Sequence, residues 1–275
     1  MNYLLFRLYG PLASWGEIAV GESRHTAAYP SKSALVGLLA AALGIRRDEE
    51  ERQLELSAGY QFAVKVLSTG HLLRDYHTTQ VPDSVGAFSY RTRRDEIVVG
   101  KERLGTILSS REYRCDALSL VAVRALEGAP YALQKVCDDL LKPKFHLYLG
   151  RKSCPLAAPL KPLIRPANAF RQALDDYPCG PLFISDRLLR TSRNEAGSAE
   201  LSRAPSLTRL SSDDVYALSL DKQQVRYYWE GDTQDFDPQL NPSLAPILTR
   251  HDQPLSRRRW QFTQRMEHLF MKEAE

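Results

Sequence analysis

The chain has 275 residues, of which 43% are hydrophobic, and a formal net charge of +4. This composition supports a normal core in one large or two small domains. No apolar run approaches the roughly 20 residues that a membrane helix needs, and no basic leader precedes the first strand pattern. We therefore expect a cytoplasmic protein without a membrane partner. The four cysteines lack C-x-x-C spacing, which argues against a zinc knuckle and against a secreted disulfide scaffold.

The first forty-odd residues carry the clearest pattern. Residues 2–9 (NYLLFRLY) alternate, with Leu4, Phe6 and Leu8 on one side, which predicts a half-buried strand. A loop rich in glycine and proline follows. A helix is then predicted up to Gly44, because its apolar residues recur with the helical period, namely Leu35, Leu38, Leu39, Ala42 and Leu43.

The start of this helix has the residues of an anion site. Ser31 or Ser33 can cap free N–H groups, and Lys32 adds a positive charge beside them. Gly44 is placed to end the helix in a left-handed conformation. Capping alone explains the same residues, so the anion site and the plain cap both remain open.

The next elements predict the order β-α-β-β-α-β. Strand patterns cover residues 59–67 and 72–81, which we expect to pair as a hairpin over the helix. A buried strand is predicted at 115–126, a helix at 131–141 and a final strand at 144–149. The fold class is therefore α+β, a ferredoxin-like (RRM-like) domain that closes at about residue 150.

Residues 83–114 have few apolar residues and many charges. We expect a projecting β-hairpin thumb there, with arms at 97–99 and 106–108. Such a thumb can wedge between nucleotides or contact a neighbouring subunit. A mobile surface loop is the alternative. The thumb residues that would contact RNA are Tyr90, Arg91, Arg93, Arg94 and Lys101.

Residues 142–171 hold seven Lys or Arg and no acid, which favours one face for a polyanion, although a solvated face is the plainer reading. Within this stretch, the turn at 150–153 is suited to phosphate. Gly150 allows close backbone approach, and Arg151, Lys152 and Ser153 supply donors. Tyr148 or Trp15 can stack on a base, although Trp15 could equally anchor its loop in the core.

After residue 150 the patterns weaken. The proline-bearing segment 155–166 should be extended, and residues 166–174 form one or two helical turns. Residues 191–212 have a flexible composition and residues 223–229 predict a strand. The end is expected to form a strand and a short helix, with Arg257–Arg259 facing RNA or a partner and with apolar residues Trp260, Phe262, Met266, Leu269 and Phe270 packing inward.

Three separated stretches resemble one known family. They are YLLFRLYGPLASWGE with the following R-H-T-x-x-Y-P-S-K-S-x-L-V-G-L-L-A-x-x-L-G-I-R-R-D, then LYLGRKSCPLAAP, and more weakly HDQPLSRRRWQFTQR. In this order they resemble the CasD family, a subunit of the type I-E CRISPR Cascade complex. Residues 191–246 have no counterpart in this resemblance.

The resemblance implies a non-catalytic subunit that binds the 5′ handle of the CRISPR RNA, without cofactor or metal. Its other partners would be Cascade subunits rather than copies of itself. Residues 1–150 would form the RRM-like domain and 151–275 an irregular C-terminal extension. The handle would lie across residues 10–33, the 150–153 turn and the thumb, with contacts from Trp15, Arg24, His25, Ser31, Lys32, Ser33, Tyr148, Gly150, Arg151, Lys152 and Ser153.

Two other functions remain possible. A metal-independent endoribonuclease needs a base and an acid within hydrogen-bond reach, and the candidates are His25, Tyr29 and Lys32. Relatives of CasD in another CRISPR subtype process RNA, which keeps this alternative open. A pure protein scaffold is the third reading. Walker A, H-E-x-x-H, G-x-S-x-G and G-x-G-x-x-G patterns do not occur, which argues against common nucleotide-binding and hydrolytic sites.

Overall fold

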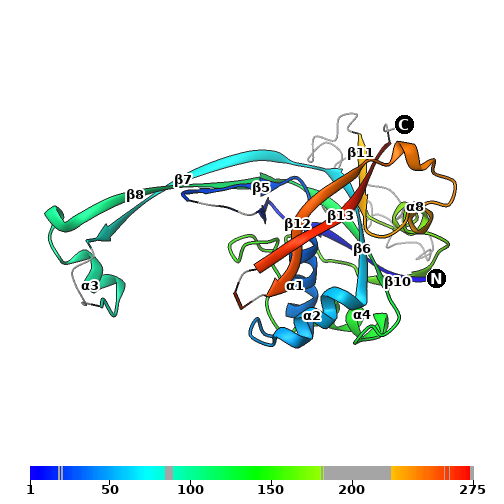
Figure 1. Ribbon diagram of the computed structural model, residues 1–275, viewed down its shortest axis with the longest axis horizontal. Helices are drawn as coiled ribbons and strands as arrows, with labels where there is room; N and C mark the ends of the chain where they lie inside the picture. The colour runs from blue at the N-terminus through cyan, green and yellow to red at the C-terminus, as the bar shows by residue number, and fades with distance from the viewer. Residues whose placement is uncertain are drawn as a thin grey trace, which may run out of the picture.

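The computed structural model describes residues 1–17, 19, 21–83, 89–180, 182, 224–256, 258–259 and 261–272. Its body is a seven-stranded antiparallel sheet with the order β10-β1-β9-β6-β11-β13-β12. Figure 1 shows a long ribbon of two strands, β7 and β8, extending away from this body. The α+β class with antiparallel pairing is therefore confirmed.

The sheet strands are β1 (Asn2–Tyr9), β6 (Tyr60–Ser68), β9 (Leu118–Ala125), β10 (Leu163–Pro166), β11 (Val225–Trp229), β12 (Ile247–Ser256) and β13 (Gln261–Lys272). The body helices are α1 (Lys32–Leu43), α2 (Glu50–Gly59), α4 (Leu133–Leu141), α5 (Phe170–Asp175) and α8 (Thr233–Phe236), with a 3₁₀ turn η2 (Pro242–Leu244). Short strands β2 (Leu12–Ala13), β3 (Trp15–Gly16), β4 (Ser23–Arg24) and β5 (Thr26–Ala27) lie between β1 and α1.

Strand β1 is covered on both faces, so the prediction of a half-buried strand is wrong. Leu4 and Phe6 pack in the cluster that contains the buried residues of α1 and α4, and Tyr3 and Leu5 pack with α5 and α8. Arg7 is buried as well, and its Nε donates to the carbonyl oxygen of Pro159 at 2.9 Å. Backbone acceptors from the segment after α4 thus allow a charged residue inside the sheet.

The predicted helix after the first loop is confirmed as α1. Ser31 is its N-cap, and its side chain accepts a hydrogen bond from the Ala34 amide. Gly44 ends the helix with φ of 75°, a left-handed conformation that glycine adopts without strain. The predicted apolar stripe is buried against the sheet. In Figure 1, α1, α2 and α4 all lie below the sheet.

The predicted strand at 144–149 is wrong. The Lys144 and Phe145 amides donate to the carbonyl oxygens of Ala42 and Ala41 at 3.1 Å, so this segment satisfies the open C-terminal end of α1 instead. Of this segment, Tyr148 alone bridges to another described residue, Pro155. The strand beside β1 is β10, from the proline-bearing segment that was expected to be extended.

The predicted hairpin of residues 59–67 with 72–81 is also wrong. β6 is a confirmed strand, but it pairs with β9 and β11. β7 (His71–Pro82) pairs along its whole length with β8 (Leu104–Cys115), and most of its side chains are exposed. A strand with so many polar side chains on both faces cannot cover a helix, which is why it leaves the body.

We call the structure from β7 to β8 the arm. It corresponds to the predicted thumb but begins twelve residues earlier, because its first strand was assigned to the core. The arm carries α3 (Arg93–Ile97) and the 3₁₀ turn η1 (Lys101–Arg103) at its tip. The predicted strand at 97–99 is therefore wrong, whereas residues 106–108 do lie in β8.

The C-terminal part adds strands to the same sheet. β11 confirms the predicted strand at 223–229, and α5 overlaps the helical turns predicted at 166–174 and ends one residue later. β13 continues as a strand where a short helix was expected, because it pairs with both β11 and β12. Residues 191–212, Arg257 and Trp260 lie outside the described residues. The domain division at residue 150 stays a prediction, and strands from both sides of it share one sheet.

Candidate functional site

The loop that follows β1 and the basic turn at residues 150–153 lie against each other. The Ser14 amide donates to the Leu149 carbonyl oxygen at 3.0 Å, and Arg151 Nη2 donates to the Arg24 carbonyl oxygen at 3.2 Å. Gly150 has φ of 85°, and a Cβ there would lie 1.9 Å from the Ser14 oxygen. The two stretches that sequence reasoning singled out separately therefore form one surface, at a contact that requires glycine.

A groove opens between this surface and the first turns of α1. Its cavity measures about 590 Å³ and is lined by Gly16, Glu17, Ala19, Arg24, Ser31, Ser33, Ala34, Gly37, Leu38, Ala41, His146, Leu147, Tyr148, Gly150 and Phe262. Small residues on one face of α1 leave this space open. We call it the groove; it brings together five predicted contact residues, Arg24, Ser31, Ser33, Tyr148 and Gly150.

A second cavity of about 300 Å³ adjoins the groove. The two cavities share Gly16, Glu17, Ser31, Ser33 and Phe262, and the second is closed on its far side by residues 249–252 of β12. The C-terminal hairpin β12–β13 therefore forms a wall of the candidate site. Neither the wall nor Phe262 as a lining residue was predicted as part of a site.

The start of α1 is not open to an external anion. The Lys32 amide donates to Asp252 Oδ2 at 2.8 Å, and Ser31 Oγ accepts from the Ala34 amide. Lys32 itself is buried, with its Nζ 2.7 Å from Glu230 Oε2. The expected anion is thus a carboxylate of the same chain, and we remove Lys32 from the set of RNA contacts.

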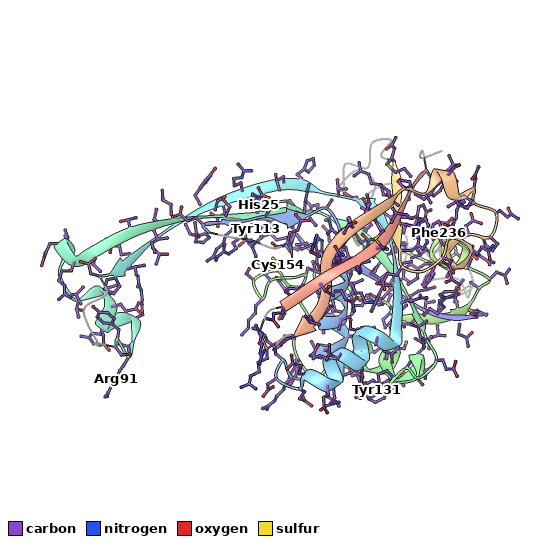
Figure 2. All side chains as sticks on the ribbon, viewed as in Figure 1. His25, Arg91, Tyr113, Tyr131, Cys154 and Phe236 are labelled. Carbon is purple, nitrogen blue, oxygen red and sulfur yellow. The ribbon has the colours of Figure 1, made fainter. Side chains whose placement is uncertain are left out.

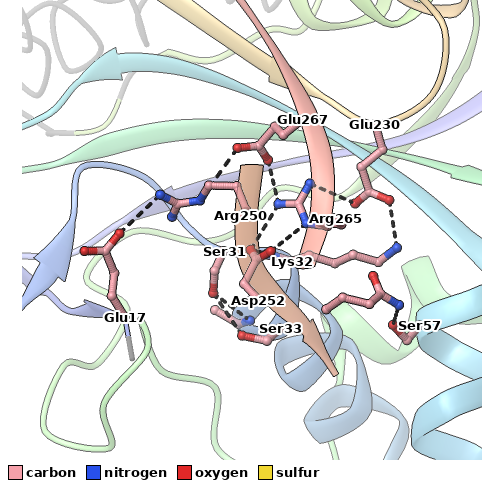
Figure 3. Close-up of polar contacts among 12 residues, drawn as sticks. Glu17, Ser31, Lys32, Ser33, Ser57, Glu230, Arg250, Asp252, Arg265 and Glu267 are labelled. Carbon is pink, nitrogen blue, oxygen red and sulfur yellow. Dashed lines mark hydrogen bonds and ion pairs between the residues drawn. The ribbon is translucent and has the colours of Figure 1, made fainter. Parts of the chain in front are cut away.

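A buried ion network surrounds this helix start, as Figure 3 shows. Arg265 Nε lies 2.6 Å from Asp252 Oδ1, and Arg265 Nη2 lies 2.6 Å from Glu267 Oε1. Arg250 Nη1 lies 3.1 Å from Glu17 Oε1 at the edge of the groove. Burial raises the pKa of Glu230. The network joins β11, β12 and β13 to α1 and holds the wall of the groove in place.

The two predicted stacking residues differ in exposure. Trp15 is only 3% exposed and packs in the core, with its amide donating to Thr26 Oγ1 at 2.8 Å. Tyr148 is 41% exposed and lines the groove. Of the two alternatives for Trp15, the structure favours the loop anchor, so Tyr148 is the stacking candidate.

The basic turn presents its side chains to the surface. Lys152 and Ser153 are exposed, and Arg151 is partly buried because its guanidinium lies over the Tyr113 ring at 5.0 Å. Contact with an aromatic face orients the guanidinium without neutralising it. The turn therefore offers two cations and a hydroxyl beside the groove.

The predicted thumb contacts lie elsewhere. Figure 2 shows Arg91 at the far end of the arm, well separated from Cys154 beside the basic turn. Arg93 pairs with Glu96 at 2.7 Å and also donates to the Gln80 carbonyl oxygen. Together with Tyr90, Arg94 and Lys101, these residues form a separate surface that the structure does not bring to the groove.

The three residues proposed for RNA cleavage are each held by a different carboxylate. Tyr29 OH donates to Glu267, and burial raises its pKa far above the ordinary tyrosine value. His25 Nδ1 lies 3.3 Å from Glu112 Oε2, and Lys32 pairs with Glu230. These contacts therefore tie the three side chains to separate acids rather than to one another.

No group of three His, Cys, Asp or Glu side chains that could hold a metal ion occurs among the residues that the structure describes. Over the same ranges, no helix has the length and apolar character required to cross a membrane. The four cysteines carry no disulfide.

Comparisons with known proteins agree on one family. The family model described as CRISPR-associated protein (Cas_Cas5) matches residues 3–266. CRISPR system Cascade subunit CasD of Escherichia coli (strain K12) is 39% identical over 170 residues, which cover 58% of this chain and 69% of that relative. The resemblance to the CasD family is thereby confirmed.

A chain of a solved CRISPR RNA-guided surveillance complex is similar in structure as well. Its TM-score is 0.55 and its identity 25%, over 99% of this chain and 90% of that chain. Because the family model covers residues 3–266, every residue that lines the groove lies within the match. The chain belongs to the CRISPR-associated protein (Cas_Cas5) family.

Proposed function

We propose that this chain is a non-catalytic subunit of a Cascade-type complex that binds the 5′ handle of the CRISPR RNA in the groove. The observation that carries the proposal is the contact between the loop after β1 and the basic turn. Arg24 and Tyr148 line the cavity at this contact, and Arg151 and Lys152 directly follow the lining residue Gly150. Cations bind phosphates, and an exposed aromatic ring stacks on an unpaired base.

The relatives support this assignment. One is a subunit of Cascade and another belongs to an RNA-guided surveillance complex. A cavity of about 590 Å³ is of the size that holds a small ligand, so we expect the groove to take a short piece of the guide rather than a long strand. Its partners would be the guide RNA and the other subunits of the complex rather than a second copy of the chain.

A non-catalytic role is supported by the partners of the three cleavage candidates. A general base and a general acid must both reach the scissile phosphate. Tyr29 and Lys32 are buried and held by Glu267 and Glu230, which leaves His25 as the exposed member of the three. Full-length chain incubated with repeat RNA in EDTA should leave the RNA intact; site-specific cutting that His25→Ala abolishes would overturn this part of the proposal.

We also infer that β10, β1, β9 and β6 form a ferredoxin-like unit. Support comes from their order and from the helices in their connections, with α1 and α2 between β1 and β6 and α4 between β9 and β10. In chain order these strands are the fourth, first, third and second of such a unit, and all their pairs are antiparallel. β11, β13 and β12 would then be additions that supply the wall of the groove.

The binding proposal can be tested on the assembled complex. Arg151→Ala combined with Lys152→Ala should weaken guide-RNA binding and lower the slope of log affinity against log salt by roughly 1.4, because two cations each release about 0.7 counterion from a single strand. Lys142→Ala with Lys144→Ala is the matched control for charge, since both side chains are exposed and lie outside the turn that contacts the loop after β1. Equal salt slopes for both double variants would contradict the proposed site.

A further inference from the structure

The root of the arm contains a carboxylate to which three segments attach. Glu112 Oε1, on β8, accepts from Arg74 Nη2 at 2.8 Å and from Arg74 Nε at 3.3 Å. Its other oxygen, Oε2, accepts from the Thr26 amide at 3.3 Å and lies 3.3 Å from His25 Nδ1. The Glu112 carbonyl oxygen accepts from Ser14 Oγ at 3.0 Å. Glu112 thus links β7, β8 and the loop that borders the groove.

The carboxylate faces inward and the groups that it holds face outward. The Glu112 side chain is 8% exposed, whereas those of Arg74 and His25 are 50% and 57% exposed. Within the described ranges, no hydrogen bond is recorded to His25 Nε2. The hydrogen bond from Arg74 is the largest cause that lowers the pKa of Glu112, so this carboxylate is charged at neutral pH.

An exposed aromatic ring stands beside these groups. Tyr76 lies two residues after Arg74 on β7, on the same face of the ribbon, and is 69% exposed. The cluster also adjoins the groove, because His25 follows Arg24, which lines the cavity. A strand of RNA that leaves the groove past Arg24 would meet His25 and Arg74 next.

We propose that Glu112 is a positioning residue that presents Arg74 and His25 as two donors for one phosphodiester of single-stranded RNA, with Tyr76 stacking on the neighbouring base. This rests on the proposed function, and it extends the RNA contact from the groove to the root of the arm. Sequence reasoning had treated His25 as a groove contact or a catalyst and had assigned no role to Arg74, Tyr76 or Glu112.

The direction in which RNA affinity changes when Glu112 is neutralised tests the proposal. A carboxylate near RNA repels phosphate, so its removal should tighten binding if it does nothing else. Glu112→Gln should instead weaken binding. The amide oxygen can still accept from Arg74 but without the charge that strengthens those hydrogen bonds, and the amide nitrogen cannot accept from the Thr26 amide or from His25, so the two donors are no longer held together. A purely structural link between β7 and β8 would not lower the number of phosphates contacted.

The experiment measures binding of the full chain to a fluorescein-labelled single-stranded RNA that contains the repeat-derived 5′ segment, over a salt series. Arg74→Gln is expected to weaken binding about 5- to 20-fold and to lower the salt slope by roughly 0.7. Glu112→Gln should weaken binding in the same range and also lower the slope. Tyr76→Ser should bind roughly tenfold more weakly, because the ring that would stack on the base is lost.

Glu22→Gln is the matched control for charge. Glu22 is exposed, and its carbonyl oxygen accepts from the Ser110 amide of β8 at 3.0 Å, so the same charge is removed close to the cluster. It should leave binding unchanged or slightly tighter. If Glu112→Gln behaves as Glu22→Gln does while Arg74→Gln keeps full affinity and slope, the inference is wrong.

Two further outcomes are separated. If the unchanged chain, alone and in its complex, binds no RNA, the proposed function fails rather than this inference. If the Arg151, Lys152 double variant loses binding but the Arg74 and Glu112 variants do not, the groove is supported as the RNA site and the root of the arm is ruled out as an RNA contact. If circular dichroism shows that Glu112→Gln does not fold, Arg74→Gln and His25→Gln test the proposal instead. Both side chains are at least half exposed, so their replacement should leave the fold intact.

Discussion

The buried network at the start of α1 and the cluster at the root of the arm use the same residue types for different ends. Arg265 is 9% exposed in its side chain and is surrounded by the buried Asp252 and Glu267 and by Glu230, whose side chain is 12% exposed. Arg74 is held by one carboxylate and is half exposed. A cation enclosed by acids stabilises the fold, whereas a cation held on one side remains able to bind an external phosphate.

This contrast also explains why the basic residues of the chain are not equivalent. Lys32 and Arg265 contribute to the net charge of the chain, but both are paired with carboxylates inside the protein. Lys152 and Arg151 lie at the surface beside the groove. Counting Lys and Arg in the sequence therefore overstates the number of cations available at the surface to an external anion.

The largest expected effect is on stability, at Arg265. Arg265→Ala should lower the free energy of unfolding by about 3–5 kcal/mol, because it leaves buried carboxylates without their cation. Arg93→Ala, which breaks the exposed pair with Glu96 on the arm, should cost less than about 1 kcal/mol. Urea unfolding measures both. Similar losses of unfolding free energy for the two variants would contradict the distinction between the buried network and the exposed pair.

The next effect concerns the contact between the two parts of the groove. Gly150→Ala places a methyl group on the Ser14 carbonyl oxygen and also requires a strained φ, whereas Gly128→Ala meets only the strain, since nothing lies within 4 Å of its Cβ position. Gly128→Ala should cost about 1–2 kcal/mol in unfolding free energy, and Gly150→Ala more than that. Equal costs would show that the loop and the turn are not in close contact.

A pair of lysines sharpens the comparison further. Lys32→Met should destabilise the fold and leave the salt slope of RNA binding unchanged, because Glu230 already neutralises this lysine. Lys152→Met should do the reverse, with a slope lower by roughly 0.7 and unfolding free energy within about 0.5 kcal/mol of the unchanged chain. A loss of slope at Lys32 would mean that the helix start does contact RNA.

The smallest expected effect is a pH dependence. The pKa of Glu112 is lowered in the folded chain, chiefly by Arg74, so its contribution to stability is present above the ordinary carboxyl pKa and is lost as pH falls through the lowered value. Arg74→Gln should reduce this acid sensitivity in urea unfolding measured from pH 6 downward. An identical pH profile for both chains would argue against a charged Glu112–Arg74 pair.

Sequence patterns predicted the elements whose local signals agree with their environment. α1 has an apolar stripe, a serine cap and a glycine stop, and all three are found as expected. β6, β9 and α4 follow from their apolar periods in the same way. The basic turn could be found because glycine, cations and a hydroxyl are adjacent in the chain.

Features that depend on distant partners could not be predicted. β12 carries a buried Asp252 and an internal Pro254, which read as loop residues until Lys32 and Arg265 are placed beside them. Lys32 and Asp252 lie 220 positions apart. β7 has a strand pattern, but whether it joined the core or the arm depended on β8.

The central claim is that the loop after β1 and the basic turn form one RNA-binding groove, and ultraviolet crosslinking of the chain in its assembled complex tests it most directly. Crosslinks from the first nucleotides of the guide should map to peptides that contain Tyr148 and residues 150–153, and to the peptide that contains Arg24. Crosslinks confined to the arm tip near Arg91, or found on other subunits only, would contradict the account.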